Sequence, residues 1–185
     1  RAEHVAVVSL SGLVGRTKTS CLADELADLC NEISYDEGTR AVLLTGTGNN
    51  PFRIDTAFMH AMPEGAERGQ LLLYSSVDSI ANLKQPVIAA INGDATGAGL
   101  ELAMACDIRI DVEGAHFGLP QIQKGFMPSD GGTQRLPRLV GQGKALEMVL
   151  TGELIDAAAA LRIGLINKVV APNELMKTAT GRTGP

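Results

Sequence analysis

The sequence predicts an α/β fold in a single domain that spans residues 1–185. Short apolar runs alternate with segments of helical periodicity, which is the pattern of strands covered by helices. The length of 185 residues suits one domain and leaves little room for a second. Hydrophobic residues make up 45% of the chain and charged residues 20%, which is ordinary for a globular protein. These three observations make a packed core the expectation.

Five apolar runs are expected to form strands, and the runs at 41–45 and 86–91 are apolar throughout, which is typical of strands buried on both faces. The expected strands are residues 4–10, 41–45, 86–91, 108–110 and 166–170. The expected helices are residues 21–33, 71–83, 98–106, 146–150 and 157–163. We expect a surface loop at 63–69 and a loose tail at 178–185.

Two residues mark the ends of the helix expected at 157–163. Asp156 stands where an N-cap residue belongs, because its carboxylate can accept a hydrogen bond from the first turn. Gly164 stands where a left-handed residue commonly ends a helix.

Charge and composition exclude several classes of partner. Lys and Arg total 16 against 21 Asp and Glu, a net charge of −5, so nucleic acid is not the expected partner. No run of about 18 apolar residues is present, so no membrane span is expected. Three cysteines without close pairing suit a reducing cytoplasm. Arg1 is not a start methionine, which suggests a trimmed chain.

The segment that carries chemistry is VIAAINGDATGAGLELAMACD, residues 87–107. An expected strand ends there, and a turn of small residues opens an apolar helix. The first amides of a helix lack partners within it and lie at its positive end. Because Gly97, Ala98 and Gly99 have little or no side chain, an anionic oxygen could approach their N–H groups closely.

Glu101 lies about one turn into this otherwise apolar helix. Burial there would disfavour the charged carboxylate and prepare the group to transfer protons. The alternative is a structural glutamate that pairs with an arginine such as Arg109 or is simply solvated.

Other motifs give weaker signals. Gly97 and Gly99 lack the third glycine of a dinucleotide-binding turn. No G-x-S-x-G sequence for a serine hydrolase is present. His4, His60 and His116 are isolated, and no spacing typical of a metal site occurs.

Three stretches together resemble the crotonase superfamily, the enoyl-CoA hydratase/isomerase family. They are NGDATGAGLELAMACDIRI, FGLPQIQKGFMPSDGGTQRLPRLVG and LTGELIDAAAALRIGLINKVV. The resemblance implies a spiral of β-β-α turns, with the family's C-terminal helical part missing or short here. It also implies an acyl-CoA substrate, no cofactor other than the coenzyme A of that substrate, and assembly as a homotrimer or a hexamer made of two trimers.

The resemblance places an oxyanion hole on two backbone N–H groups, those of Thr56 and Ala98. Thr56, Ala57, Phe58 and Met59, together with Ala98, would contact the substrate. The stretch from Arg53 to Thr56 reads Arg-Ile-Asp-Thr, where the family commonly has an Ala-Gly-Ala-Asp type of run. Substrate identity therefore stays open.

The catalytic positions implied by the resemblance are Glu101, Gln121 and Asp130. Hydratases of the family use two glutamates, and Gln121 stands at the second position. A glutamine can hold water but cannot transfer a proton at neutral pH. Asp130 would serve as a second acid, because some isomerases and carbon–carbon hydrolases of the superfamily carry a working aspartate near this position. The alternative for Asp130 is a cap or turn residue before a helix that begins near Thr133.

The leading hypothesis is a cytoplasmic enzyme of fatty acid metabolism that hydrates or isomerises an enoyl-CoA through a thioester enolate. A carbon–carbon bond hydrolase of the β-diketone type, motivated by Asp130, is one alternative. A catalytically silent module that binds coenzyme A ligands is the other, motivated by Gln121.

Overall fold

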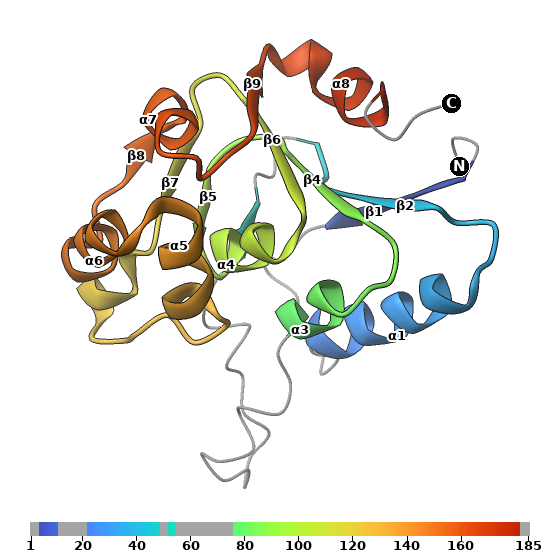
Figure 1. Cartoon of the computed structure of the whole chain (residues 1–185), viewed down its shortest axis with the longest axis horizontal. Helices are drawn as coiled ribbons and strands as arrows, with labels where there is room; N and C mark the ends of the chain where they lie inside the picture. Colours follow the sequence, from blue (N-terminus) through green and yellow to red (C-terminus); the bar gives the residue numbers. More distant parts are fainter. Residues whose placement is uncertain (1–3, 11–21, 49–51, 55–75, 182–185) are drawn as a thin grey trace, which may run out of the picture.

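A computed structural model describes residues 4–10, 22–48, 52–54 and 76–181 of the chain (Figure 1). Two sheets organise the fold. The larger sheet has the strand order β1-β2-β4-β6-β9, and all its neighbouring strands run parallel. The smaller sheet has the order β3-β5-β7-β8, in which only the β7–β8 pair is antiparallel. This mixed α/β architecture confirms the predicted class.

The strands of the larger sheet are β1 (Val5–Leu10), β2 (Ala41–Gly46), β4 (Val87–Ile91), β6 (Ile108–Val112) and β9 (Lys168–Val170). These are the five strands that the sequence predicts, with ends shifted by up to two residues. All five residues of β4 and the first five of β2 are buried, as expected for strands covered on both faces.

The smaller sheet was not predicted as a unit because its strands have only two or three residues each. They are β3 (Arg53–Ile54), β5 (Ala95–Gly97), β7 (His116–Gly118) and β8 (Ile155–Asp156). A run this short cannot show a period of two, which is the sequence signal of a strand. The β5 strand matters most, because it turns directly into the helix that bears Glu101.

Helices cover both faces of the larger sheet (Figure 1). α1 (Leu22–Tyr35) and α3 (Ser76–Ala81) lie on one side, and α8 (Leu175–Gly181) packs against β4 and β6 on the other. The α8 helix corrects the expectation of a loose tail from residue 178, because the helix continues through Gly181 and buries Leu175 and Ala179. A stripe of two residues is too short to predict from sequence.

The remaining elements follow α4 (Ala98–Ala105) in the chain, and α5 packs directly against it. They are the 3-10 helix η2 (Pro120–Lys124), α5 (Gly132–Val140), α6 (Gln142–Thr151), α7 (Ala157–Arg162) and the 3-10 helix η3 (Pro172–Glu174). Asp156 caps α7 as predicted, since its Oδ1 accepts a hydrogen bond from the N–H of Ala159 over 2.7 Å. Gly164 has a φ of 79°, which confirms the left-handed residue after that helix.

Several predictions fall on residues outside the described ranges. These are the loop at 63–69, the first part of the helix expected at 71–83, and the contact residues Thr56, Ala57, Phe58 and Met59 with the nearby His60. Across the part of the chain that the structure describes, no helix is long and apolar enough to cross a bilayer.

Candidate active site

The turn between β5 and α4 places helix amides at the edge of the smaller sheet. Gly97 ends β5 with φ 58° and ψ −128°, a backbone conformation that is nearly exclusive to glycine. The chain therefore turns sharply and begins α4 at Ala98, whose side chain is fully buried. The positive end of α4 faces this turn, as the sequence predicts.

Glu101 is the only charged residue of α4 and is 0% exposed. Its carboxylate accepts three hydrogen bonds. Oε1 accepts from the backbone N–H groups of Asp130, over 2.9 Å, and Gly132, over 2.8 Å. Oε2 accepts from the side-chain amide of Gln121 over 3.0 Å. The geometry thus joins Glu101, Gln121 and Asp130, the three catalytic candidates, in one cluster.

The alternative partner for Glu101, the Arg109 guanidinium, is not available. Its Nε donates to the carbonyl of Leu165 over 2.7 Å, and its Nη1 donates to the carbonyl of Cys106 over 2.6 Å. Arg109 therefore ties β6 to neighbouring loops. Both structural alternatives for Glu101, the pair with Arg109 and the solvated side chain, are wrong.

The pKa of the Glu101 carboxyl is raised from 4.5 to about 7. Burial is the largest cause, since the charged form loses water. The hydrogen bond from Gly132 N–H opposes it, and the negative charge of Asp130 raises the pKa further. A carboxyl with a pKa near neutrality can both accept and release a proton under physiological conditions.

Only one position on this carboxylate remains for a proton. Each carboxylate oxygen has two lone pairs, and Oε1 uses both for Asp130 and Gly132. Among the described residues Oε2 has a single partner, Gln121. Among the described residues, the second lone pair of Oε2 is therefore the position open to a proton.

The loop from Asp130 to Gly132 is shaped around this carboxylate. A Cβ atom added to Gly132 would lie 2.7 Å from Oε1 of Glu101 and 2.9 Å from Cβ of Pro128. The N-cap of α5 is Gly131, and no side chain caps that helix, so the alternative of Asp130 as a helix cap is wrong, although Asp130 does lie in the bend before α5. Asp130 is 8% exposed and lies beside Glu101, where its charge acts on the glutamate.

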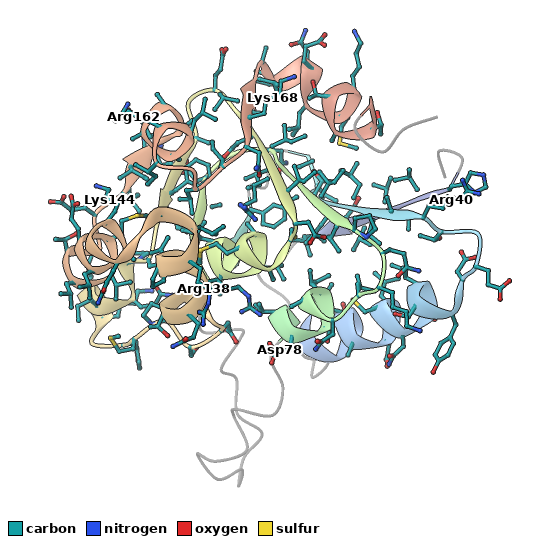
Figure 2. The ribbon with its side chains drawn as sticks, viewed as in Figure 1. Arg40, Asp78, Arg138, Lys144, Arg162 and Lys168 are labelled. Atoms are coloured by element: carbon teal, nitrogen blue, oxygen red, sulfur yellow. The ribbon has the colours of Figure 1, made fainter. Side chains whose placement is uncertain are left out.

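Arg135 fixes this loop from outside. Its Nη1 donates to the carbonyl of Asp130 over 3.0 Å, and its Nη2 lies 3.6 Å from Oδ1 of Asp78 on α3. Figure 2 shows Asp78 on the side of α3 that faces α5. The sequence analysis did not find this role, because no local pattern joins Arg135 to Asp130 or to Asp78. Arg135 is close enough in sequence to reach Asp130, but the contact forms because the left-handed turn at Gly131 brings the Asp130 carbonyl next to the Arg135 side chain.

The other reactive groups that the structure describes do not build a second centre. No cluster of three or more His, Cys, Asp or Glu side chains is placed to hold a metal ion in the described ranges. Burial raises the pKa of the Cys30 thiol to about 11 and that of the Cys106 thiol to about 12. Both thiols are therefore protonated at neutral pH, and a protonated thiol is a poor nucleophile.

The site thus combines a buried acid of near-neutral pKa, which backbone amides hold, with a glycine turn at the start of a helix, an arrangement suited to proton transfer and to an anionic oxygen. A family model described as Enoyl-CoA hydratase/isomerase matches residues 5–183. The chain belongs to this family, the crotonase superfamily.

Curated relatives and solved structures agree with this assignment. The short-chain-enoyl-CoA hydratase of Clostridium acetobutylicum is 46% identical over 159 residues, which cover 84% of this chain and 60% of the relative. The crotonyl-CoA hydratase of Syntrophomonas wolfei is 42% identical over 158 residues, 82% of this chain and 60% of the relative. A crystal structure of an enoyl-CoA hydratase from Bacillus anthracis superposes with a TM-score of 0.85 at 36% identity, covering 98% of this chain and 72% of that one. The present chain thus spans about three fifths of the two relatives' length.

Proposed function

We propose that the protein acts on acyl-CoA thioesters, hydrating or isomerising an enoyl-CoA through a thioester enolate. The observation that carries this proposal is the buried Glu101, whose pKa of about 7 suits a group that takes and returns a proton. The relatives named short-chain-enoyl-CoA hydratase and crotonyl-CoA hydratase support the substrate class.

In the hydration direction, one carboxylate can complete the cycle. The water oxygen bonds to Cβ, and the electron pair of the double bond moves to the thioester oxygen as an enolate. The proton released by water goes to Oε2 of Glu101, which then returns a proton to Cα. Backbone N–H groups at Ala98 and Thr56 would hold the enolate oxygen, and removing one such donor typically costs about 3–4 kcal/mol of barrier.

Isomerisation uses the same parts. Glu101 would remove a proton from Cα of a 3-enoyl thioester, and the enolate would be held in the same hole. The proton would then be placed at the far carbon of the dienolate by Glu101 or by Asp130, whose carboxyl lies close enough to raise the pKa of Glu101. The absence of a second glutamate at Gln121 does not hinder this reaction.

A panel of thioesters tests the proposal. Crotonyl-CoA reports hydration, 3-butenoyl-CoA reports isomerisation, a β-diketone thioester reports carbon–carbon cleavage, and free crotonate serves as the control without a thioester. We expect turnover of at least one enoyl-CoA and none of crotonate. Coenzyme A thioester binding by calorimetry without turnover of any member would favour the silent module instead.

We also propose self-association, expected as a trimer or a hexamer of two trimers. Its support is a group of exposed apolar side chains on η2, on the loop after it, on α6 and on the segment after α6. A hydrogen bond from Gln123 Nε2 to the carbonyl of Gly152, the residue after α6, ties η2 to the end of that helix. The group consists of Ile122, Phe126, Met127, Leu146, Leu150 and Leu154. Sedimentation should show an oligomer that Leu150→Lys weakens, whereas a monomer at all concentrations would contradict the proposal. The cytoplasmic location stays a prediction.

A further inference from the structure

The side-chain amide of Gln121 is held in one orientation by its neighbour. Gln121 is 4% exposed, and its Nε2 donates to Oε2 of Glu101. An ionised carboxylate can only accept hydrogen bonds, and only the nitrogen end of an amide can donate. As long as Glu101 is charged, the oxygen end of the Gln121 amide must therefore point away from it.

That oxygen, Oε1 of Gln121, is buried and has no hydrogen-bond partner among the residues that the structure describes. A buried carbonyl oxygen without a donor is unfavourable, because it has lost water and gained nothing. The cluster around Glu101 therefore lacks one donor, and the missing donor belongs at Oε1 of Gln121.

Neither member of this pair is free to reorient. The amides of Asp130 and Gly132 hold the other oxygen of the Glu101 carboxylate. Gln121 lies on η2, which the side chain of Gln123 ties to the carbonyl of Gly152 at the end of α6. The acceptor therefore has a fixed place and a fixed direction.

We propose that Gln121 makes the site selective for a thioester that carries a hydrogen-bond donor beside Glu101, namely a hydroxyl on its β carbon. This inference rests on the proposed function, since it assumes that a thioester lies against Glu101. A β-ketone oxygen would face the Gln121 oxygen with no hydrogen between them, so 3-oxoacyl thioesters are disfavoured.

Calorimetric titration with three thioesters of equal chain length tests the inference in the wild-type protein. The ligands are butyryl-CoA, 3-hydroxybutyryl-CoA and acetoacetyl-CoA, and the pH is about one unit above the pKa of Glu101 so that its carboxyl is charged. The fraction of 3-hydroxybutyryl-CoA that remains is measured after the titration. We expect 3-hydroxybutyryl-CoA to bind about tenfold more tightly than butyryl-CoA, and acetoacetyl-CoA to bind no more tightly than butyryl-CoA.

Two variants assign the preference to Gln121. Gln121→Met keeps the length of the side chain and removes the acceptor, so the tenfold preference should disappear while butyryl-CoA still binds. In Gln121→Glu the two carboxyl groups share one proton, and the new side chain keeps an acceptor oxygen, so the preference should be kept. Equal affinities in the wild type, tighter binding of acetoacetyl-CoA, or an unchanged preference in Gln121→Met would each overturn the inference. If none of the three thioesters binds the wild type, the result would instead contradict the proposed function.

Discussion

The main-chain N–H of Gly132 donates a hydrogen bond of 2.8 Å to Oε1 of Glu101, and a Cβ atom on Gly132 would lie 2.7 Å from that same oxygen. The carboxylate and the glycine thus occupy space that a larger residue would need. A bond from a buried amide to a buried carboxylate is stronger than one between neutral groups. This contact, between residues 31 apart in sequence, fixes the acid against the start of α5.

Gly132→Ala should displace the Glu101 carboxylate and lower turnover of an enoyl-CoA by about a hundredfold, because small shifts of a catalytic group have effects of this size. The control is Gly143→Ala in α6, where an added Cβ meets nothing within 4 Å. That variant should keep full activity and gain a few tenths to about 1 kcal/mol of stability from helix propensity. Steady-state rates and thermal melting measure both. Full activity in Gly132→Ala would show that the position of Glu101 is not critical.

Arg135→Met should reduce turnover by about tenfold, because the loop that bears the two N–H donors loses its outer hydrogen bond to the Asp130 carbonyl. Arg135→Lys should restore part of the rate, since an ammonium group can donate to the same carbonyl. A displaced loop also weakens its bonds to Glu101, so the pH at which activity is half-maximal should rise in Arg135→Met. The matched control is Arg138→Met on the same helix, whose exposed guanidinium bonds to Gln134 (Figure 2). A rate loss without any change in the pH profile would assign Arg135 a purely structural role.

Asp111 on β6 should make stability depend on pH. It is 0% exposed, its Oδ2 has no hydrogen-bond partner within the described ranges, and its pKa is raised from 3.8 to about 8. Burial is the main cause; the bond from Val112 N–H opposes it, and the charge of Asp94 adds to it. The folded state therefore keeps a proton that the unfolded state has released, and stability falls as the pH rises from about 4 to about 8.

Asp111→Asn removes this titration. As the pH rises from 5 to 8, the free energy of unfolding of the variant should therefore increase relative to that of the wild type by an amount on the order of 2 kcal/mol. Urea unfolding at several pH values measures the difference. The control is Asp28→Asn on the exposed face of α1, which should leave the pH dependence unchanged. Parallel stability curves for wild type and Asp111→Asn would contradict the account.

The parts of the fold that the sequence predicts correctly are those with a long local signal. The apolar runs of β2 and β4 and the helical spacing of Leu26, Leu29 and Ile33 in α1 reflect burial directly. The smaller sheet and α8 lack such a signal, because two or three residues or a pair of buried side chains carry no period. The strands of the smaller sheet pair with one another, and α8 packs against β4 and β6, so both depend on contacts between residues that are distant in sequence.

The site follows the same division. The local pattern alone indicates Glu101 as a candidate, because it is the single charged residue on an otherwise apolar helix. The positions of Gln121 and Asp130 come from the family resemblance, and their meeting with Glu101 depends on chain segments 20 and 29 residues away. The buried state of Asp111 could not be predicted, because IRIDV reads as an alternating strand with one polar face.

The pH dependence of turnover should report the pKa of Glu101. If the ionised carboxylate starts the reaction as a base, kcat/KM should rise through a pH of about 7 and then level off. An unperturbed glutamate would reach half of its rise near pH 4.5, so the two cases are well separated. A rise with its midpoint below about pH 5 would mean that the buried carboxyl does not control the reaction.

The central claim is that Glu101 transfers the proton, and the most direct measurement is crotonyl-CoA turnover by wild type and Glu101→Gln. The amide of the variant can still accept from Asp130 and Gly132 while it lacks the ability to take a proton, so the loop geometry is kept. The control is Glu113→Gln at an exposed position after β6. We predict a loss of about a hundred- to ten-thousandfold for Glu101→Gln and none for Glu113→Gln. Equal rates in wild type and Glu101→Gln would contradict the claim.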